Sequence, residues 1–268
     1  MITIFTIAGS AVYAAEIPVS DQDQLITSSD WTEISNLQDE MKKEEPDATI
    51  DYDKALKVYV DCNLIKLQTA DTKKLTSALE SANYVWVIPF KMEKTYGMFT
   101  VAKGLPLREE AKSVLTKAEQ EEVKNHAGKW MITETAEHTV EPYYDILLEK
   151  REALSDCTRV VLVGSQPGMR QPVALGMDDE TARIWISLGY QYPVMKKIPE
   201  TQNVESGVYS FDSVAEISDT YIEDSEVSTG AGVQSRSSMK YVAGIGIIVI
   251  GSILILSVLK KKKLEDYE

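Results

Sequence analysis

The stretch YVWVIPF, residues 84–90, decides the fold. It is apolar throughout and rich in β-branched and aromatic residues, which is the pattern of a strand buried on both faces. The stretch YGMFTVA, residues 96–102, follows after a short polar turn and is expected to pair beside it. The sequence therefore predicts a sheet with residues 84–90 near its centre.

The segments before this strand predict two helices and one further strand. Asp30 is expected to cap an opening helix, with Glu33 at the capping-box position. Residues 55–61 (ALKVYVD) alternate as a strand, and Asp71 is expected to cap a second helix. The helices would bury apolar faces formed by Trp31, Ile34, Leu37 and Met41 in the first and by Leu75, Ala78, Leu79 and Ala82 in the second.

The segments after it repeat a similar order. A long helix is predicted over residues 108–125, with Ala111, Val114, Leu115 and Ala118 on one face. A strand at 130–134, a helix opened by Pro142, a buried strand at 159–163 and a hairpin of 172–175 with 183–188 follow. We expect an α+β fold of two strand-helix-strand-strand units, starting near Ala55 and Lys129, in one sheet; chance resemblance of short patterns is the alternative.

The C-terminal part predicts a membrane anchor. Residues 241–259, from Tyr241 to Leu259, carry no charge, and about 19 residues at about 1.5 Å each cross a hydrocarbon core of about 30 Å. Four lysines open the tail 260–268, which places that tail in the cytoplasm by the positive-inside rule. We therefore expect a single-pass protein of the cell membrane, with its N-terminus outside and the membrane as a partner through this helix.

A stalk and a signal peptide complete the predicted topology. Residues 199–235 hold eight acids and no Lys or Arg, so 199–240 is expected to be a disordered acidic stalk after a globular domain at 16–198. The apolar start with Val12, Tyr13 and Ala14 predicts a signal peptide over 1–14, although no basic residue precedes it. A buried first strand is the alternative for this segment.

Charge and cysteine content narrow the class of partner. The tail holds four lysines and three acids, which leaves 24 basic and 39 acidic residues, a net charge of about −15, on the rest of the chain. This acidity argues against nucleic acid as a partner. No Asn-x-Ser/Thr site is present, which favours a bacterial envelope. Cys62 and Cys157 are permitted to form a disulfide in that compartment, and two buried thiols are the alternative.

No pattern in the sequence marks a catalytic or metal site. His126 and His138 belong to no zinc motif, and Ser165 lies in GSQPG, which lacks the glycine spacing of a nucleophile elbow. The acids around Asp178 suit a hard cation or, more simply, the tip of a hairpin. We expect no cofactor and no catalytic residue.

These features favour a non-enzymatic, membrane-anchored extracellular domain at the cell surface that binds a protein or envelope component. The alternative is an extracytoplasmic hydrolase of wall or peptide substrates that uses Ser165, His126, His138 and the acids near Asp178. A subunit that pairs through its membrane helix is a third interpretation, indicated weakly by Gly244 and Gly251.

Overall fold

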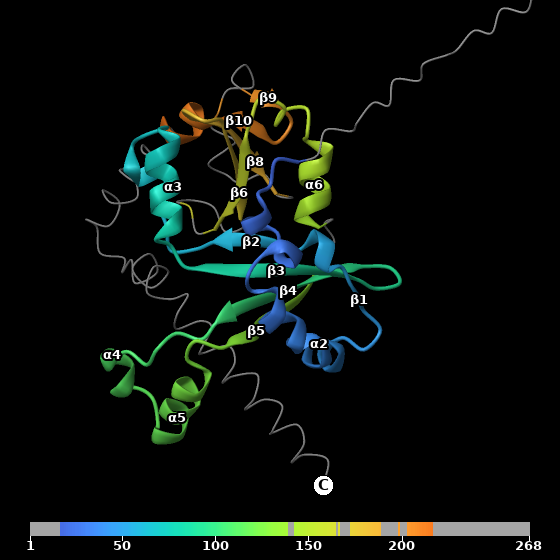
Figure 1. The fold of residues 1–268 in the computed structure, drawn as a ribbon, viewed down its shortest axis with the longest axis vertical. Helices are drawn as coiled ribbons and strands as arrows, with labels where there is room; N and C mark the ends of the chain where they lie inside the picture. Colours follow the sequence, from blue (N-terminus) through green and yellow to red (C-terminus); the bar gives the residue numbers. More distant parts are fainter. Residues whose placement is uncertain are drawn as a thin grey trace, which may run out of the picture.

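The computed structural model describes residues 17–138, 142–164, 166, 172–188, 198 and 203–216. Their fold is mixed α/β, built on one large sheet (Figure 1). The strands are β1 (Thr49–Ile50), β2 (Leu56–Tyr59), β3 (Tyr84–Lys91), β4 (Tyr96–Lys103), β5 (Trp130–His138), β6 (Arg159–Val163), β7 (Val173–Met177), β8 (Ala182–Ser187), β9 (Asn203–Glu205) and β10 (Val208–Ser210). They run in the order β5-β4-β3-β2-β6-β7-β8-β10-β9, and β1 pairs with the end of β3.

Two antiparallel halves make this sheet. One half is β5-β4-β3-β2, the other is β6-β7-β8-β10-β9, and the parallel pair β2 with β6 joins them. The first predicted unit is confirmed, because β2, β3 and β4 are neighbours and α3 (Thr72–Glu80) connects β2 to β3. The predicted second unit is divided: its first strand, β5, pairs with β4 at the far edge, since a local connection returns the chain beside the strand it has just left.

The sheet is covered on both faces. On one face, α3 and helical residues 211–216 cover β6 to β10, while α1 (Trp31–Ile34), η3 (Ser35–Leu37) and α2 (Gln38–Glu44) cover β3 to β5. On the opposite face, α6 (Tyr143–Glu149) packs on β2, β6 and β8, and α3 and α6 flank the sheet in Figure 1. Short 3₁₀ turns complete the path: η1 (Asp21–Asp23), η2 (Leu25–Thr27), η4 (Tyr52–Lys54) and η5 (Ile65–Leu67).

The N-terminal segment lies inside the sheet, between its two halves. Strands β2 and β6 pair only at Val58 with Leu162 and at Tyr59 with Val163. Beyond that point the strands separate, and the segment fills the gap, which we call the fork: Val19 bridges to Val160 and Gln24 bridges to Leu56. The segment passes from one face, where Ile17 and Val19 are buried, to the other, where Leu25 is buried.

The predicted long helix over 108–125 is wrong, because the chain forms α4 (Glu109–Lys112), a turn, and α5 (Lys117–His126). Thr116 begins α5 with a capping box: its hydroxyl accepts from the Glu119 N–H, and the Glu119 carboxylate accepts from the Thr116 N–H. A Thr at this position ends one helical run and starts another. The expected apolar face is unburied, since Val114 is 80% exposed and α5 buries no residue.

The domain boundary expected at Ile198 lies too early. Strand β10 pairs with β8, and Val208, Tyr209, Phe211 and Val214 are buried. β-branched Val208 and aromatic Tyr209 suffice to extend the sheet with a short strand despite acidic surroundings, and Phe211 begins the helical residues that follow. The folded part therefore continues to residue 216. The rest of the predicted stalk, the predicted anchor and tail, and the predicted signal peptide at 1–14 lie outside the described residues.

Candidate functional site

Asp23 is the centre of a buried polar cluster where the N-terminal segment meets the sheet. Its side chain is 2% exposed and sits on the face that carries Tyr59 and Arg159. One carboxylate oxygen accepts from the Tyr59 hydroxyl at 2.7 Å; the other accepts from the Ser20 hydroxyl at 2.6 Å and from the Arg159 guanidinium at 3.0 Å. These bonds, two of them to residues in β2 and β6, fasten the segment into the fork.

Lys57 is the second charge in this cluster. It points from β2 onto the same face, where its Nζ lies 4.5 Å from the ring centre of Tyr84, 5.3 Å from that of Trp86 and 3.8 Å from the Asp23 carboxylate. Burial lowers the pKa of Lys57, and the nearby carboxylates oppose that shift. The aromatic rings and the Asp23 carboxylate stabilise the ammonium group and so offset its loss of hydration.

Asp30 has a different role from the predicted helix cap. Its side chain makes no cap hydrogen bond; instead its carboxylate accepts from the Tyr84 hydroxyl at 2.8 Å and from the Trp86 indole N–H at 3.0 Å. Lys103 lies 3.9 Å away. The buried donors on β3 outcompete the exposed backbone N–H groups of α1, because a buried donor without a partner costs more.

The polar cluster, which comprises Asp23, Asp30, Lys57, Tyr59, Tyr84 and Arg159, is engaged within itself. Burial, followed by the adjacent carboxylates, raises the pKa of Tyr59; burial and the hydrogen bond to Asp30 raise that of Tyr84. Both hydroxyls thus stay protonated and donate to carboxylates at neutral pH. The cluster lies between the apolar clusters of the two sheet halves, and it stabilises their junction.

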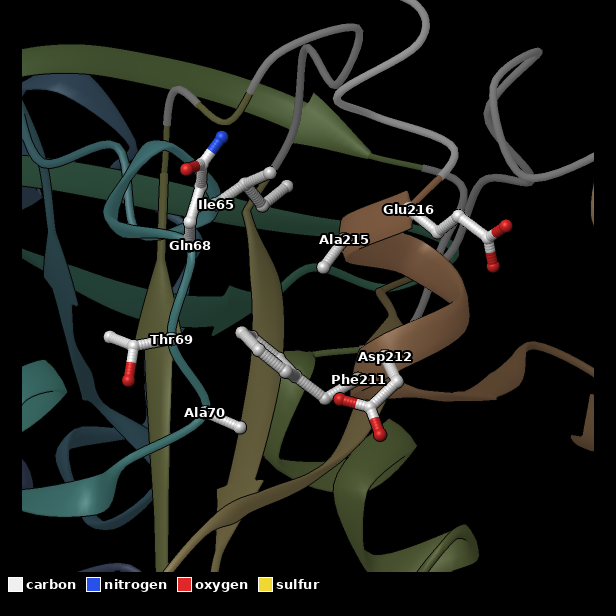
Figure 2. Close-up of a pocket in the computed structure, with 8 residues that line it drawn as sticks. All are labelled: Ile65, Gln68, Thr69, Ala70, Phe211, Asp212, Ala215 and Glu216. Atoms are coloured by element: carbon white, nitrogen blue, oxygen red, sulfur yellow. The ribbon is translucent and has the colours of Figure 1, made fainter.

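An open pocket of about 330 Å³ lies on the other half of the sheet (Figure 2). Segment 65–70 forms one wall and helical residues 211–216 form the other. Ile65 and Phe211, 2% and 3% exposed, provide an apolar floor, and Asp212 lies at its margin. Gln68 ends η5 in the left-handed conformation, with φ of 48°, which is uncommon for a residue other than glycine.

The four residues that sequence analysis considered for a hydrolase are not brought together where the structure describes them. His126 ends α5, His138 lies at the end of β5, and Asp178 follows β7. Strands β5 and β7 are five places apart in the sheet, which at about 4.8 Å per strand separates them by about 24 Å. Ser165 lies outside the described residues.

Asp178 belongs to the turn of the β7–β8 hairpin, as the simpler interpretation predicts. Its carboxylate accepts from the N–H groups of Glu180 and Thr181 at 2.8 and 2.6 Å, and Arg183 lies at 3.1 Å. The backbone hydrogen bonds lower the pKa of Asp178. Within the described ranges, no three His, Cys, Asp or Glu side chains are grouped to hold a metal ion.

Cys62 and Cys157 are both free thiols. Cys62 packs against the apolar cluster under α3, and Cys157 belongs to the cluster under α6, on the opposite face of the sheet. Burial raises the pKa of each thiol to about 11. Of the two interpretations made from sequence, the structure supports two separate thiols.

Sequence reasoning missed the polar cluster and the pocket. No signal of the cluster was present in β2: the branched aliphatic residues of the alternating stretch ALKVYVD share one face, and Lys57 lies on the other, where a charged residue is ordinary. The partners, Asp23 and Arg159, are more than 100 residues apart, so no local pattern links them. Comparison with protein-family models, with curated proteins and with solved structures finds no match for this chain.

Proposed function

We propose that this chain is a single-pass membrane protein whose folded domain lies outside the cytoplasm and binds a protein or an envelope component. The apolar run from Tyr241 to Leu259 and the lysines after it support the anchor and its orientation. Helices among the described residues are too short or too polar to cross a membrane, and residues 241–259 lie outside that part. Residues 217–240 would then form the stalk.

The observation that carries a binding role is an arm formed by residues 105–129. It leaves the sheet after β4 and returns to β5, and Figure 1 shows α4 and α5 projecting past these strands. Backbone hydrogen bonds between Gly104 and Lys129 and between Gly128 and Gly104 close its base. A ten-residue helix is marginal in water when nothing packs on it, so an arm that exposes Val114 gains stability from a partner.

Binding rather than catalysis is proposed because the charged groups gathered by the fold hold one another. The carboxylates of Asp23 and Asp30 accept hydrogen bonds from five side chains of the domain itself, in addition to their contacts with lysines. A group so engaged supports the scaffold more readily than it transfers a proton to a substrate.

Orientation is tested on the full-length chain in intact cells, with Cys62 and Cys157 replaced by alanine. A membrane-impermeant maleimide should label a Glu121→Cys variant on the arm and spare an Asp266→Cys variant in the tail. Labelling of the tail but not the arm would contradict the proposed topology.

Binding is tested with a photoreactive amino acid in place of Val114, in native membranes. We expect a discrete crosslinked product that is absent when the same group replaces Asp53, an exposed residue next to β2. Equal products from both positions, or none from either, would count against the arm as a binding element.

A further inference from the structure

The open pocket has the chemistry of a site for a basic side chain. Its floor consists of Ile65, Phe211, Ala70 and Ala215, and Figure 2 shows the Phe211 ring and the Ala215 methyl directed into the space between the two walls. The helical wall carries two acids, Asp212 at the margin and Glu216, whose carboxylate is turned away from the space in Figure 2. Gln68 and Thr69 add polar groups along the opposite wall. An apolar floor with the Asp212 carboxylate at its margin suits an aliphatic stem that ends in a cation.

The pocket is built by the fold. Phe211 packs 6.0 Å from the ring centre of Trp185 in β8, and Ile65 is buried in the same apolar cluster. Ser210 fixes the start of the helical wall, because its hydroxyl accepts from the Ser213 N–H at 3.3 Å. The two walls are therefore attached to the sheet before any ligand arrives.

We infer that this pocket binds a lysine or arginine side chain presented by a partner protein, with the aliphatic stem on Phe211 and Ile65 and the cation beside Asp212. Charge favours this occupant, since the chain carries a net charge of −14. The volume favours a side chain over a free amine. About 330 Å³ is at the lower limit for small-molecule sites, and an open site of that size buries too little of a free ligand to offset the cost of association.

This inference rests on the proposed function only in that the occupant belongs to a protein. The pocket lies beside β8 and β10, whereas the arm lies between β4 and β5 at the other half of the sheet. A test with purified protein and short peptides is independent of membrane topology and of the arm, so the two proposals fail separately.

The test uses the full-length chain in detergent micelles, with ¹³C-labelled methyl groups of isoleucine and alanine observed by NMR. The probe is acetyl-Ala-Lys-Ala-amide, and the matched control is the same peptide with norleucine, which keeps the stem and removes the charge. We expect the lysine peptide to shift the Ile65 and Ala215 signals in a saturable way, about fivefold more tightly than the norleucine peptide. Equal affinities, or no shift with the lysine peptide, would overturn the inference.

Variants and a free amine separate the remaining explanations. Asp212→Asn should remove the difference between the two peptides, whereas Asp53→Asn, at an exposed residue outside both the pocket and the arm, should leave it intact. The Asp212→Asn spectrum also reports folding, since the methyl signals outside the pocket should not move. Butylamine should bind at least about fivefold more weakly than the lysine peptide. If butylamine binds as tightly as the lysine peptide, the site is one for free amines. If the Asp212→Asn variant still prefers the lysine peptide, the proposed ion pair is wrong.

Discussion

Replacing Asp23 with asparagine is expected to release the N-terminal segment from the fork. Asparagine has nearly the same shape as aspartate but no charge. Its NH₂ group is a donor, and it replaces a carboxylate oxygen that accepted hydrogen bonds. Tyr59 and Ser20 donate to different oxygens of Asp23, so one of the two hydroxyls loses its acceptor. Arg159, whose side chain is 17% exposed, loses its charged partner. The variant thus removes a charge from the cluster without creating a cavity.

The size of the effect follows from burial. Removing one partner of a buried ion pair costs about 3–5 kcal/mol, and the remaining exposure of Arg159 places the expected loss near about 3 kcal/mol. In a domain of about 200 residues, each kcal/mol lowers Tm by about 2–4 °C. We therefore expect Asp23→Asn to lower Tm by about 6–12 °C.

The assay is thermal unfolding of the full-length chain in detergent micelles, followed by near-ultraviolet circular dichroism. Asp53→Asn is the matched control, because Asp53 is exposed and its loss should move Tm by no more than about 2 °C. Hydrogen exchange should rise in residues 17–27 of the Asp23 variant. A Tm within about 2 °C of the parent protein would refute the argument that this carboxylate holds the fork.

Three further outcomes are expected. Burial raises the pKa of Tyr143 to about 12 and also raises that of Tyr59. The contribution of each protonated tyrosine to the free energy of unfolding is therefore complete below the unfolded pKa near 10 and is lost as pH rises above it. The free energy of unfolding, measured with urea between pH 9 and 11.5, should change little below pH 10 and then decline by up to about 1.4 kcal/mol per pH unit for each such tyrosine. Each Tyr→Phe variant should decline less steeply. Thr116→Ala should destabilise α5 by about 1 kcal/mol, which should appear as faster amide exchange in that helix. Tm should not change, because α5 buries no side chain. A lower Tm would show that the arm packs on the rest of the domain. Cys62 and Cys157 should react slowly with a thiol reagent at pH 8, where a pKa of about 11 leaves about one thousandth as thiolate, and both should react on unfolding; a chain lacking two titratable thiols would contradict this.

Strands were predictable from sequence because their signal is local. Residues 84–90, 96–102 and 159–163 each form the expected strand, and a one-residue shift would move their side chains to the wrong face. The cap of α3 was also predictable, since Asp71 accepts from the Lys74 N–H, three residues along the chain. These features depend on contacts within a few residues.

The errors have the opposite origin. Asp30 satisfies the local rule for a helix cap, yet its carboxylate accepts hydrogen bonds from Tyr84 and Trp86, more than 50 residues along the chain. Residues 208–214 lie in an acidic stretch without basic residues, and only the free edge of β8 gives them a place to pair. Asp23 could not be identified because its partners come from β2 and β6, which meet only in the folded sheet.

The position of the N-terminal segment has a consequence for the order of folding. Val19 needs Val160 as its neighbour, so this segment leaves the ribosome about 140 residues before the strand with which it pairs. Until then the N-terminal segment and the edge of β2 lack their partner strand β6, and such free edges can pair with other chains. We expect closure of the fork to be a late, slow step, and a chain halted before β6 to depend on a chaperone to remain unaggregated.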